Sequence, residues 1–216
     1  MNKRLTGWLA SIALVLLTLA SPAQAQLTVG SDYVLIDPPQ TTDKPDKIEV
    51  TEYFSYACPH CNDLNPYISK WAAKLPADVS FKRVPVNFNP FYQLMARLFY
   101  TLEAIHELDR LNDAVFEAIH VKGLRLIDDK SILEWVTSQG VDAKKFSDAY
   151  SSFGVASKVS RGNQLAQEAK ISGVPSITVD GRYLVVGKNV KSHAELLALA
   201  DKVIDKVRAE RSSKKK

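Results

Sequence analysis

The chain has little cysteine, and Cys58 and Cys61 are the only two in its 216 residues. Exported proteins held together by disulfides usually have several cysteines spread along the chain, so one close pair excludes such a framework. A structural zinc site would need a second pair of ligands, and His106, His120 and His193 do not have the spacing of one. The cysteines are therefore predicted to serve chemistry, with a small structural disulfide as the alternative.

The chain also lacks a strong charge of either sign, since its formal net charge is +4. Arg211, Lys214, Lys215 and Lys216 form a basic tail at 211–216, which we expect to be a solvated, disordered end. No basic stripe lined with aromatic residues accompanies it, so no nucleic acid partner is expected. The sequence leaves open whether this tail touches a membrane surface, and it shows no internal repeat.

Only one stretch is long and apolar, and it lies at the N-terminus. Lys3 and Arg4 precede the nearly continuous apolar run 5–20, and Ala-Gln-Ala at 23–25 is a pattern typical of signal-peptide cleavage. We therefore predict a secretory signal peptide at 1–25. A membrane anchor is the alternative, because the run approaches the length that spans a bilayer.

The cysteine pair lies between a predicted strand at 48–56 and a predicted helix at 62–75. Residues three apart in a first helical turn are neighbours on one face, so the Cα separation is compatible with a disulfide of normal geometry. Cys58 and Cys61 can thus cycle between dithiol and disulfide with little backbone movement.

The remaining patterns predict an α/β protein. Strands are expected at 33–36 and 79–88, with a hairpin at 177–185 around Asp180-Gly181. Helices are expected from Asn89-Pro90 onward, at 111–120, 129–139, 142–153 and 155–170, and after the Ser192…Glu195 capping box. One sheet with helices on both faces accounts for this order if the block after Asn89 is a helical insertion.

Three motifs carry a family resemblance: E-Y-F-S-Y-A-C-P-H-C at 52–61, V-N-F at 86–88 and G-V-P at 173–175. Together they resemble the thioredoxin fold and, more narrowly, the DsbA family of periplasmic thiol–disulfide oxidoreductases. The resemblance spans nearly the whole chain after residue 25. It implies a central mixed sheet and an inserted helical domain, with thioredoxin parts at 26–88 and 156–210 and the insertion at 89–155.

The resemblance also implies where the protein works and with what. The expected location is the periplasm, and the expected substrates are unfolded exported proteins that carry thiols. A DsbB-like membrane quinone reductase would reoxidise the pair. No bound cofactor is required, and we expect a monomer.

Cys58 is the expected nucleophile because it lies at a helix N-terminus, near unpaired N–H groups and the positive end of the helix dipole. The thiolate is the reactive form of cysteine. A helix terminus contributes at most ~2 kcal/mol, or roughly 1.5 pKa units. The rest of any large shift in pKa must come from local donors, for which His60 and the N–H and S–H groups of Cys61 are the candidates.

His60 and Pro59 complete the C-P-H-C motif and are included among the catalytic residues. A partly positive imidazole at His60 would stabilise the Cys58 thiolate of the dithiol and make the pair a strong oxidant. The alternative is a histidine that only faces solvent. Cys61 is expected to be the less exposed, resolving thiol, for which a proton acceptor is useful.

Glu52 is the candidate acceptor, because it shares strand parity with Ile48, Val50 and Phe54 and so points to an apolar face. Burial would raise its pKa and favour proton exchange. The alternative is a glutamate at an edge or in solvent. Either Arg83 or Lys82 could pair with Glu52; Arg83 aligns with the lysine usual in the family.

Val174 and Pro175 are the expected substrate-binding residues. By resemblance, the peptide bond between them is cis and packs against the cysteines. The N–H and C=O of Val174 can pair with an extended peptide, whereas a proline in an ordinary tight turn is the alternative. By resemblance, a valine before this proline is typical of the oxidases of the family.

These observations predict a dithiol oxidase that transfers the Cys58–Cys61 disulfide to newly exported, unfolded proteins. A disulfide isomerase or reductase on the same fold is one alternative, although the segment 26–47 leaves no room for the dimerisation domain of such isomerases. A chaperone that binds peptides, in which the redox pair is incidental, is the other.

Overall fold

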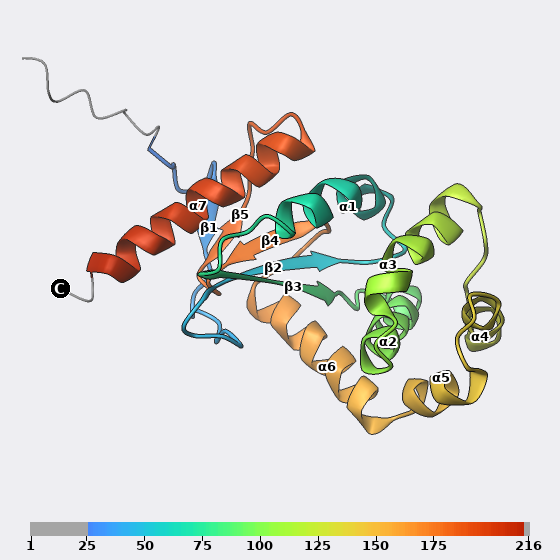
Figure 1. The fold of residues 1–216 in the computed structure, drawn as a ribbon. Coiled ribbons are helices and arrows are strands. Elements are labelled where there is room, and N and C mark those ends of the chain that lie inside the picture. The colour runs from blue at the N-terminus through green and yellow to red at the C-terminus, as the bar shows by residue number, and fades with distance from the viewer. Residues whose placement is uncertain (1–25, 214–216) are drawn as a thin grey trace, which may run out of the picture.

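The structure is a computed structural model that describes residues 26–213, so the expected signal peptide lies outside the described residues. A five-stranded mixed sheet forms its centre, with strand order β1-β5-β4-β2-β3 (Figure 1). The strands β2 and β3 are parallel, and the other neighbours are antiparallel. The strands are β1 (Tyr33–Leu35), β2 (Ile48–Phe54), β3 (Val79–Pro85), β4 (Ser176–Val179) and β5 (Tyr183–Val185).

Helices cover both faces of this sheet, as the α/β prediction requires. Figure 1 shows α1 and α7 on one face, α6 on the other, and α2 to α5 gathered beyond one end of the strands. The helices are α1 (Pro59–Ala72), α2 (Pro90–Ala104), α3 (Leu108–Phe116), α4 (Asp129–Ser138), α5 (Ala143–Tyr150), α6 (Phe153–Glu168) and α7 (His193–Ser213), with a π-helical turn η1 (Glu117–Val121) after α3.

The strand β2 joins the layers because all seven of its residues are buried. Successive side chains of a strand point to opposite faces. Val50 accordingly packs with Leu64 of α1 and Val203 of α7, whereas Tyr53 packs on the other face with the apolar residues of α6. A strand buried on both faces reads as a nearly continuous apolar run, so the two glutamates within β2 need partners.

Local signals explain most boundaries of the elements. Asn89 caps α2 by accepting the N–H of Tyr92 at 2.9 Å, with Pro90 at the first helical position. Pro85 is the last residue of the edge strand β3, which is where a strand tolerates proline. Asp180 and Gly181 both have positive φ, 59° and 61°, as the two central residues of a type I′ turn require, and the Arg182 N–H closes the turn on the Val179 carbonyl at 3.1 Å.

Three expectations about helices need correction. Only half of the expected capping box forms, since Ser192 caps Glu195 but the Glu195 carboxylate accepts the N–H of Lys191. The expected helix at 111–120 ends in the π-helical turn η1. The pattern at 142–153 is interrupted after Tyr150, because Ser152 caps a new helix, α6.

The basic tail also begins differently from the expectation of a disordered end. Arg211 belongs to α7, and its guanidinium donates to the carbonyls of Pro45 at 3.1 Å and Lys47 at 2.9 Å and pairs with Asp180. These acceptors hold the end of α7 against the sheet. The last three lysines lie outside the described residues.

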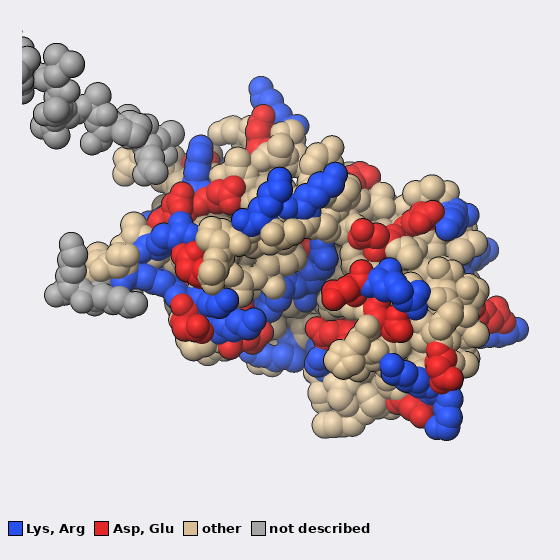
Figure 2. All heavy atoms as spheres, in the orientation of Figure 1, with Lys and Arg blue, Asp and Glu red and all other residues tan. Residues whose placement is uncertain are grey.

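On the face shown in Figure 2, basic and acidic side chains are interspersed, so this face carries no broad field of one sign. Within residues 26–213, no helix has both the length and the apolar character needed to cross a membrane.

Candidate active site

Cys58 lies at the junction of β2 and α1, where it is the N-cap residue of the helix. Its extended backbone (φ −90°, ψ 117°) lets its sulfur accept the N–H of Cys61 at 3.4 Å. A capping side chain normally satisfies one of the four free N–H groups of the first helical turn. The sequence thus places a sulfur where Ser, Thr, Asp or Asn usually lies, and Pro59 follows at the first helical position.

The two sulfurs differ in exposure and in protonation, although both residues are buried. Cys58 is 5% exposed, Cys61 is 0% exposed, and both are free thiols in this structure. The pKa of Cys58 is lowered to about 6, first by the hydrogen bond with the Cys61 side chain and, against the effect of burial, also by the N–H groups of Cys61 and His60 and by the charge of His60. The same hydrogen bond, together with burial, raises the pKa of Cys61.

The sequence had left several candidate donors for the Cys58 thiolate, and the structure ranks them. The Cys61 side chain comes first, and the charge of His60 comes last among the causes. His60 lies in the first turn of α1 with its side chain exposed, beside an exposed Pro59. Within the described residues, its imidazole makes no hydrogen bond, so its influence on Cys58 is that of a nearby charge.

Val174 and Pro175 approach Cys58 from the loop before β4. The peptide bond between them is cis, as expected. The Cys58 thiol donates to the Val174 carbonyl at 3.3 Å, which brings residues 116 positions apart in sequence into contact. Among residues 26–213, the Val174 N–H has no hydrogen-bond partner, and the residue is half-buried. This donor is therefore available beside the nucleophile.

Glu52 is buried on the face of β2 that was predicted, with 2% of its surface exposed. Its carboxylate accepts the Nε–H of Arg83 at 2.8 Å, whereas Lys82 pairs with Glu49 and Asp43 at 2.9 and 2.7 Å. The choice between the two cations is thus decided for Arg83. It follows from the parallel register, which sets Glu52 opposite Arg83 and points both side chains to one face.

Burial raises the pKa of Glu52, and the charge and hydrogen bond of Arg83 lower it in part. The negative charge of Glu52 is in turn one of the causes that raise the pKa of Cys61. The carboxylate is therefore electrostatically coupled to the Cys61 thiol.

Sequence reasoning missed the polar side chains that hold Arg83 in place. The Arg83 guanidinium donates to Asn65 at 3.2 Å and to Ser69 at 3.0 Å, both from α1. Asn65 also accepts the side-chain amide of Asn112 from α3 at 3.2 Å. Asn65 is buried at 6% exposure, and a polar residue on the apolar face of a predicted helix is the signal that could have drawn attention to it.

Comparisons with known proteins agree with this geometry. Residues 49–198 match the family model described as DSBA-like thioredoxin domain. The chain is 45% identical over 179 residues to the thiol:disulfide interchange protein DsbA of Bordetella parapertussis, covering 83% of this chain and 85% of that protein.

Solved structures are similar over comparable lengths. The crystal structure of Pseudomonas aeruginosa DsbA superposes with a TM-score of 0.82 at 36% identity, covering 86% of this chain and 97% of that one. The oxidoreductase DsbA from Xylella fastidiosa gives a TM-score of 0.79 at 29% identity, covering 85% and 98%.

Proposed function

This chain belongs to the DsbA family of thioredoxin-fold proteins and is a thiol:disulfide oxidoreductase, and from that premise we propose that its Cys58–Cys61 pair donates a disulfide to newly exported, unfolded proteins in the periplasm. The observation that carries the proposal is the position of the Cys58 sulfur at the N-cap of α1, where it accepts the Cys61 N–H at 3.4 Å. Hydrogen bonds from Cys61 lower the pKa of Cys58 to about 6, whereas the pKa of Cys61 is raised. A stabilised thiolate favours the reduced form of the pair, and a pair that prefers to be reduced is a strong oxidant of other thiols.

The reaction begins from the oxidised pair. A substrate thiolate attacks the Cys58 sulfur, the Cys58–Cys61 bond breaks, and the Cys61 sulfur leaves with the electron pair and takes up a proton. A second substrate thiolate then attacks the substrate sulfur of the mixed disulfide, and Cys58 leaves as a thiolate. The substrate thus loses two electrons and gains a disulfide, while the pair becomes a dithiol.

The residues around the sulfurs suit these steps. Hydrogen bonds from Cys61 stabilise Cys58 as the leaving group. Glu52 would donate a proton to the Cys61 sulfur when that sulfur leaves, and would accept the proton again when the disulfide re-forms. The free N–H of Val174 would pair with the backbone of an extended substrate, with Pro175 holding it beside Cys58. His60 would add positive charge near the thiolate, with Pro59 placing it in the first turn.

An apolar surface near the sulfurs fits unfolded substrates. Phe88 and Phe91 are 44% and 38% exposed, and Phe88 stacks on Tyr92 with ring centroids 6.0 Å apart. Burial and the charges of both cysteines raise the pKa of Tyr92, so Tyr92 is within electrostatic reach of the pair. Unfolded chains offer the apolar side chains that such a surface would contact.

A DsbB-like membrane quinone reductase would reoxidise the dithiol, and we propose that the protein works as a monomer. The thioredoxin parts at 26–88 and 156–210 would carry the redox chemistry, and the helical insertion at 89–155 would form the adjoining wall of the site. The pair needs only an external oxidant for turnover, so no bound cofactor enters the cycle.

The test is the equilibrium of the Cys58–Cys61 pair with glutathione buffers, which yields its reduction potential. A potential near the ~−120 mV of DsbA-type oxidants would support disulfide donation. A potential near the ~−270 mV of thioredoxin would overturn it in favour of a reductase.

A further inference from the structure

His120 contacts the backbone segment that leads into the nucleophile. Its Nε2 lies 2.7 Å from the carbonyl oxygen of Tyr56, two residues before Cys58. A carbonyl oxygen can only accept a hydrogen bond, so the Nε2 atom carries a proton and donates it. Tyr56 is only 1% exposed, so water has little access to its carbonyl. His120 therefore supplies the hydrogen-bond donor that a buried carbonyl needs.

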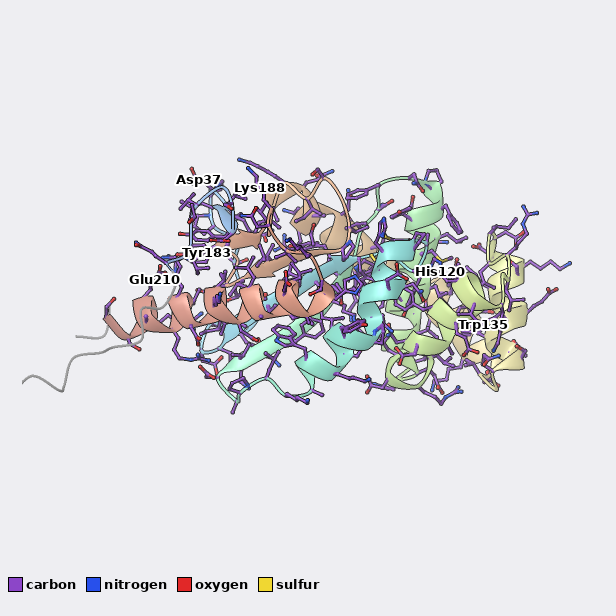
Figure 3. The ribbon with its side chains drawn as sticks, turned by 90° about the horizontal axis from the view of Figure 1, so that it is seen from above. Asp37, His120, Trp135, Tyr183, Lys188 and Glu210 are labelled. Atoms are coloured by element: carbon purple, nitrogen blue, oxygen red, sulfur yellow. The ribbon has the colours of Figure 1, made fainter. Side chains whose placement is uncertain are left out.

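The π-helical turn η1 presents His120 to this carbonyl. The turn follows α3 directly, and the Lys122 N–H closes it on the Glu117 carbonyl at 2.9 Å. The imidazole also stacks on Phe116, with ring centroids 6.2 Å apart. Figure 3 shows His120 beside the end of α1, between the sheet and the outer helices. Single π-helical turns occur frequently at functional sites.

The segment α3–η1 also contacts the side chain of Tyr56. The Tyr56 hydroxyl donates to Asn112 of α3 at 3.1 Å. Its ring packs edge-on against Phe116, also of α3, at 5.0 Å and against Phe54 of β2 at 5.3 Å. Tyr56 is therefore fixed at both its backbone and its side chain by the continuous segment α3–η1.

Tyr56 lies inside the tight turn that carries the reactive sulfur. The Cys58 N–H donates to the Ser55 carbonyl at 3.1 Å, and the Ala57 N–H donates to the Ser55 hydroxyl at 3.2 Å, so residues 55–58 form one tight turn. The Cys58 sulfur in turn lies between the Cys61 N–H at 3.4 Å and the Val174 carbonyl at 3.3 Å. A shift of Tyr56 would change these distances.

We infer that His120 is a positioning residue for the redox reaction, because its hydrogen bond to the Tyr56 carbonyl holds the 55–58 turn so that the Cys58 thiolate meets its donors on Cys61. The inference rests on the proposed function and adds a residue from the helical insertion to the machinery that sets the redox potential. His120 acts through the backbone and does not touch the reacting sulfurs.

The test compares His120→Phe, which keeps the ring and removes the donor, with His120→Gln, which keeps a donor that can reach the carbonyl. The Phe variant is expected to shift the glutathione equilibrium about fivefold toward the disulfide, the effect of losing roughly one hydrogen bond, and to raise the Cys58 pKa measured by thiolate absorbance. The Gln variant should stay close to the parent protein. His193→Phe, at a half-buried histidine of α7 that contacts Tyr67, is the matched control and should change neither readout.

An unchanged equilibrium and pKa in the Phe variant would overturn the inference, and so would equal shifts in the Phe and Gln variants. If the Phe variant does not fold in a urea titration, His120→Asn, whose amide is too short to reach the carbonyl, takes its place with the same expected shift. A thioredoxin-like potential in the parent protein would refute disulfide donation but would leave this comparison between variants intact.

Discussion

At each end of the sheet an arginine pairs with a buried acid, and the two ion pairs have different roles. At the active-site end, Arg83 pairs with Glu52, which is 2% exposed. At the opposite end, Arg211 pairs with Asp180, which is 7% exposed. Figure 3 shows this separation, with Tyr183 and Glu210 near the far end and His120 near the other.

At the far end, the charges complete the fold. Arg211 also donates to two backbone carbonyls, and Glu210 is bound by Arg182 at 2.9 Å, by Lys206 at 2.8 Å and by the hydroxyl of Tyr183 at 2.8 Å. These hydrogen bonds lower the pKa of Glu210 despite its partial burial. These contacts join residues of α7 to β5 and to the β4–β5 turn, so the cluster ties α7 to the sheet.

At the active-site end, the buried acidic groups have fewer hydrogen-bond donors than the acids at the far end. One arginine offsets only part of the burial of Glu52, so the pKa of Glu52 stays raised. The pKa of Cys58 is lowered at the expense of Cys61, whose pKa is raised. The same kind of ion pair thus stabilises structure where donors are plentiful and sets protonation where they are few.

The largest expected effect comes from removing the nucleophile. Cys58→Ser should reduce the oxidation of a dithiol peptide to the uncatalysed rate, because Cys61 alone cannot form the disulfide that the substrate thiolate attacks. The control is Cys61→Ser, whose Cys58 thiolate should attack a peptide that already contains a disulfide, break its S–S bond and remain in the mixed disulfide, because no Cys61 thiol is present to release it. Full biological activity in the Cys58 variant would instead support the chaperone alternative.

Arg211→Ala tests whether the ion pair at the far end of the sheet affects stability but not redox chemistry. It leaves Asp180 with fewer partners and two carbonyls without donors, so the free energy of unfolding should fall by about 2 to 3 kcal/mol. The glutathione equilibrium of the cysteine pair should not change, because this end of the sheet has no part in setting the thiol pKa values. A urea titration measures the first quantity, and a shift in the redox equilibrium would contradict the separation.

Lowering the pH should reduce the reactivity of the active site, because it protonates the Cys58 thiolate. With a folded-state pKa of about 6, lowering the pH from about 7 to about 5 should slow alkylation of the reduced protein about tenfold, because only the thiolate reacts. The lowered pKa also means that the thiolate stabilises the reduced protein above the ordinary thiol pKa, and that this contribution is lost as the pH falls through about 6. The stability of the oxidised protein, which has no thiol, should lack this dependence.

His60→Ser tests whether the exposed imidazole contributes to that thiolate. Removing a nearby positive charge should raise the Cys58 pKa and lower the reduction potential, with a change of about fivefold in the glutathione equilibrium. His193→Ser provides a matched histidine on α7, away from the cysteines. An unchanged potential in the His60 variant would remove that residue from the mechanism.

The site could be predicted as far as local sequence determines it. The cysteine spacing, the place of Cys58 at a helix N-terminus, the cis bond before Pro175 and the buried face of Glu52 all follow from short patterns or from the family resemblance. The structure agrees with each of them. Local patterns sufficed for the cysteines and for Glu52 because these features depend on neighbours within one turn or one strand, whereas the cis bond was predicted from the family resemblance.

Features that depend on tertiary pairing could not be predicted in this way. The β2–β3 register decides between Arg83 and Lys82, and it is set by packing between strands that lie about thirty residues apart. Arg211 looked like part of a solvated tail because its acceptors, Pro45, Lys47 and Asp180, are distant in sequence. His120 looked like an ordinary helical residue because the π-helical turn has no pattern in the sequence.

The most discriminating effect is expected from Glu52→Gln, because two consequences of the change oppose each other. Loss of the negative charge removes one cause of the raised pKa of Cys61, so Cys61 should ionise more readily. Loss of the carboxylate also removes the proposed proton acceptor. If Glu52 relays protons, release of a mixed disulfide by Cys61 should slow about fivefold in spite of the easier ionisation. Stopped-flow measurement of that step, with Glu49→Gln on the opposite face of β2 as the control, gives the answer. An unaltered or faster step would show that Glu52 acts on Cys61 only through its charge.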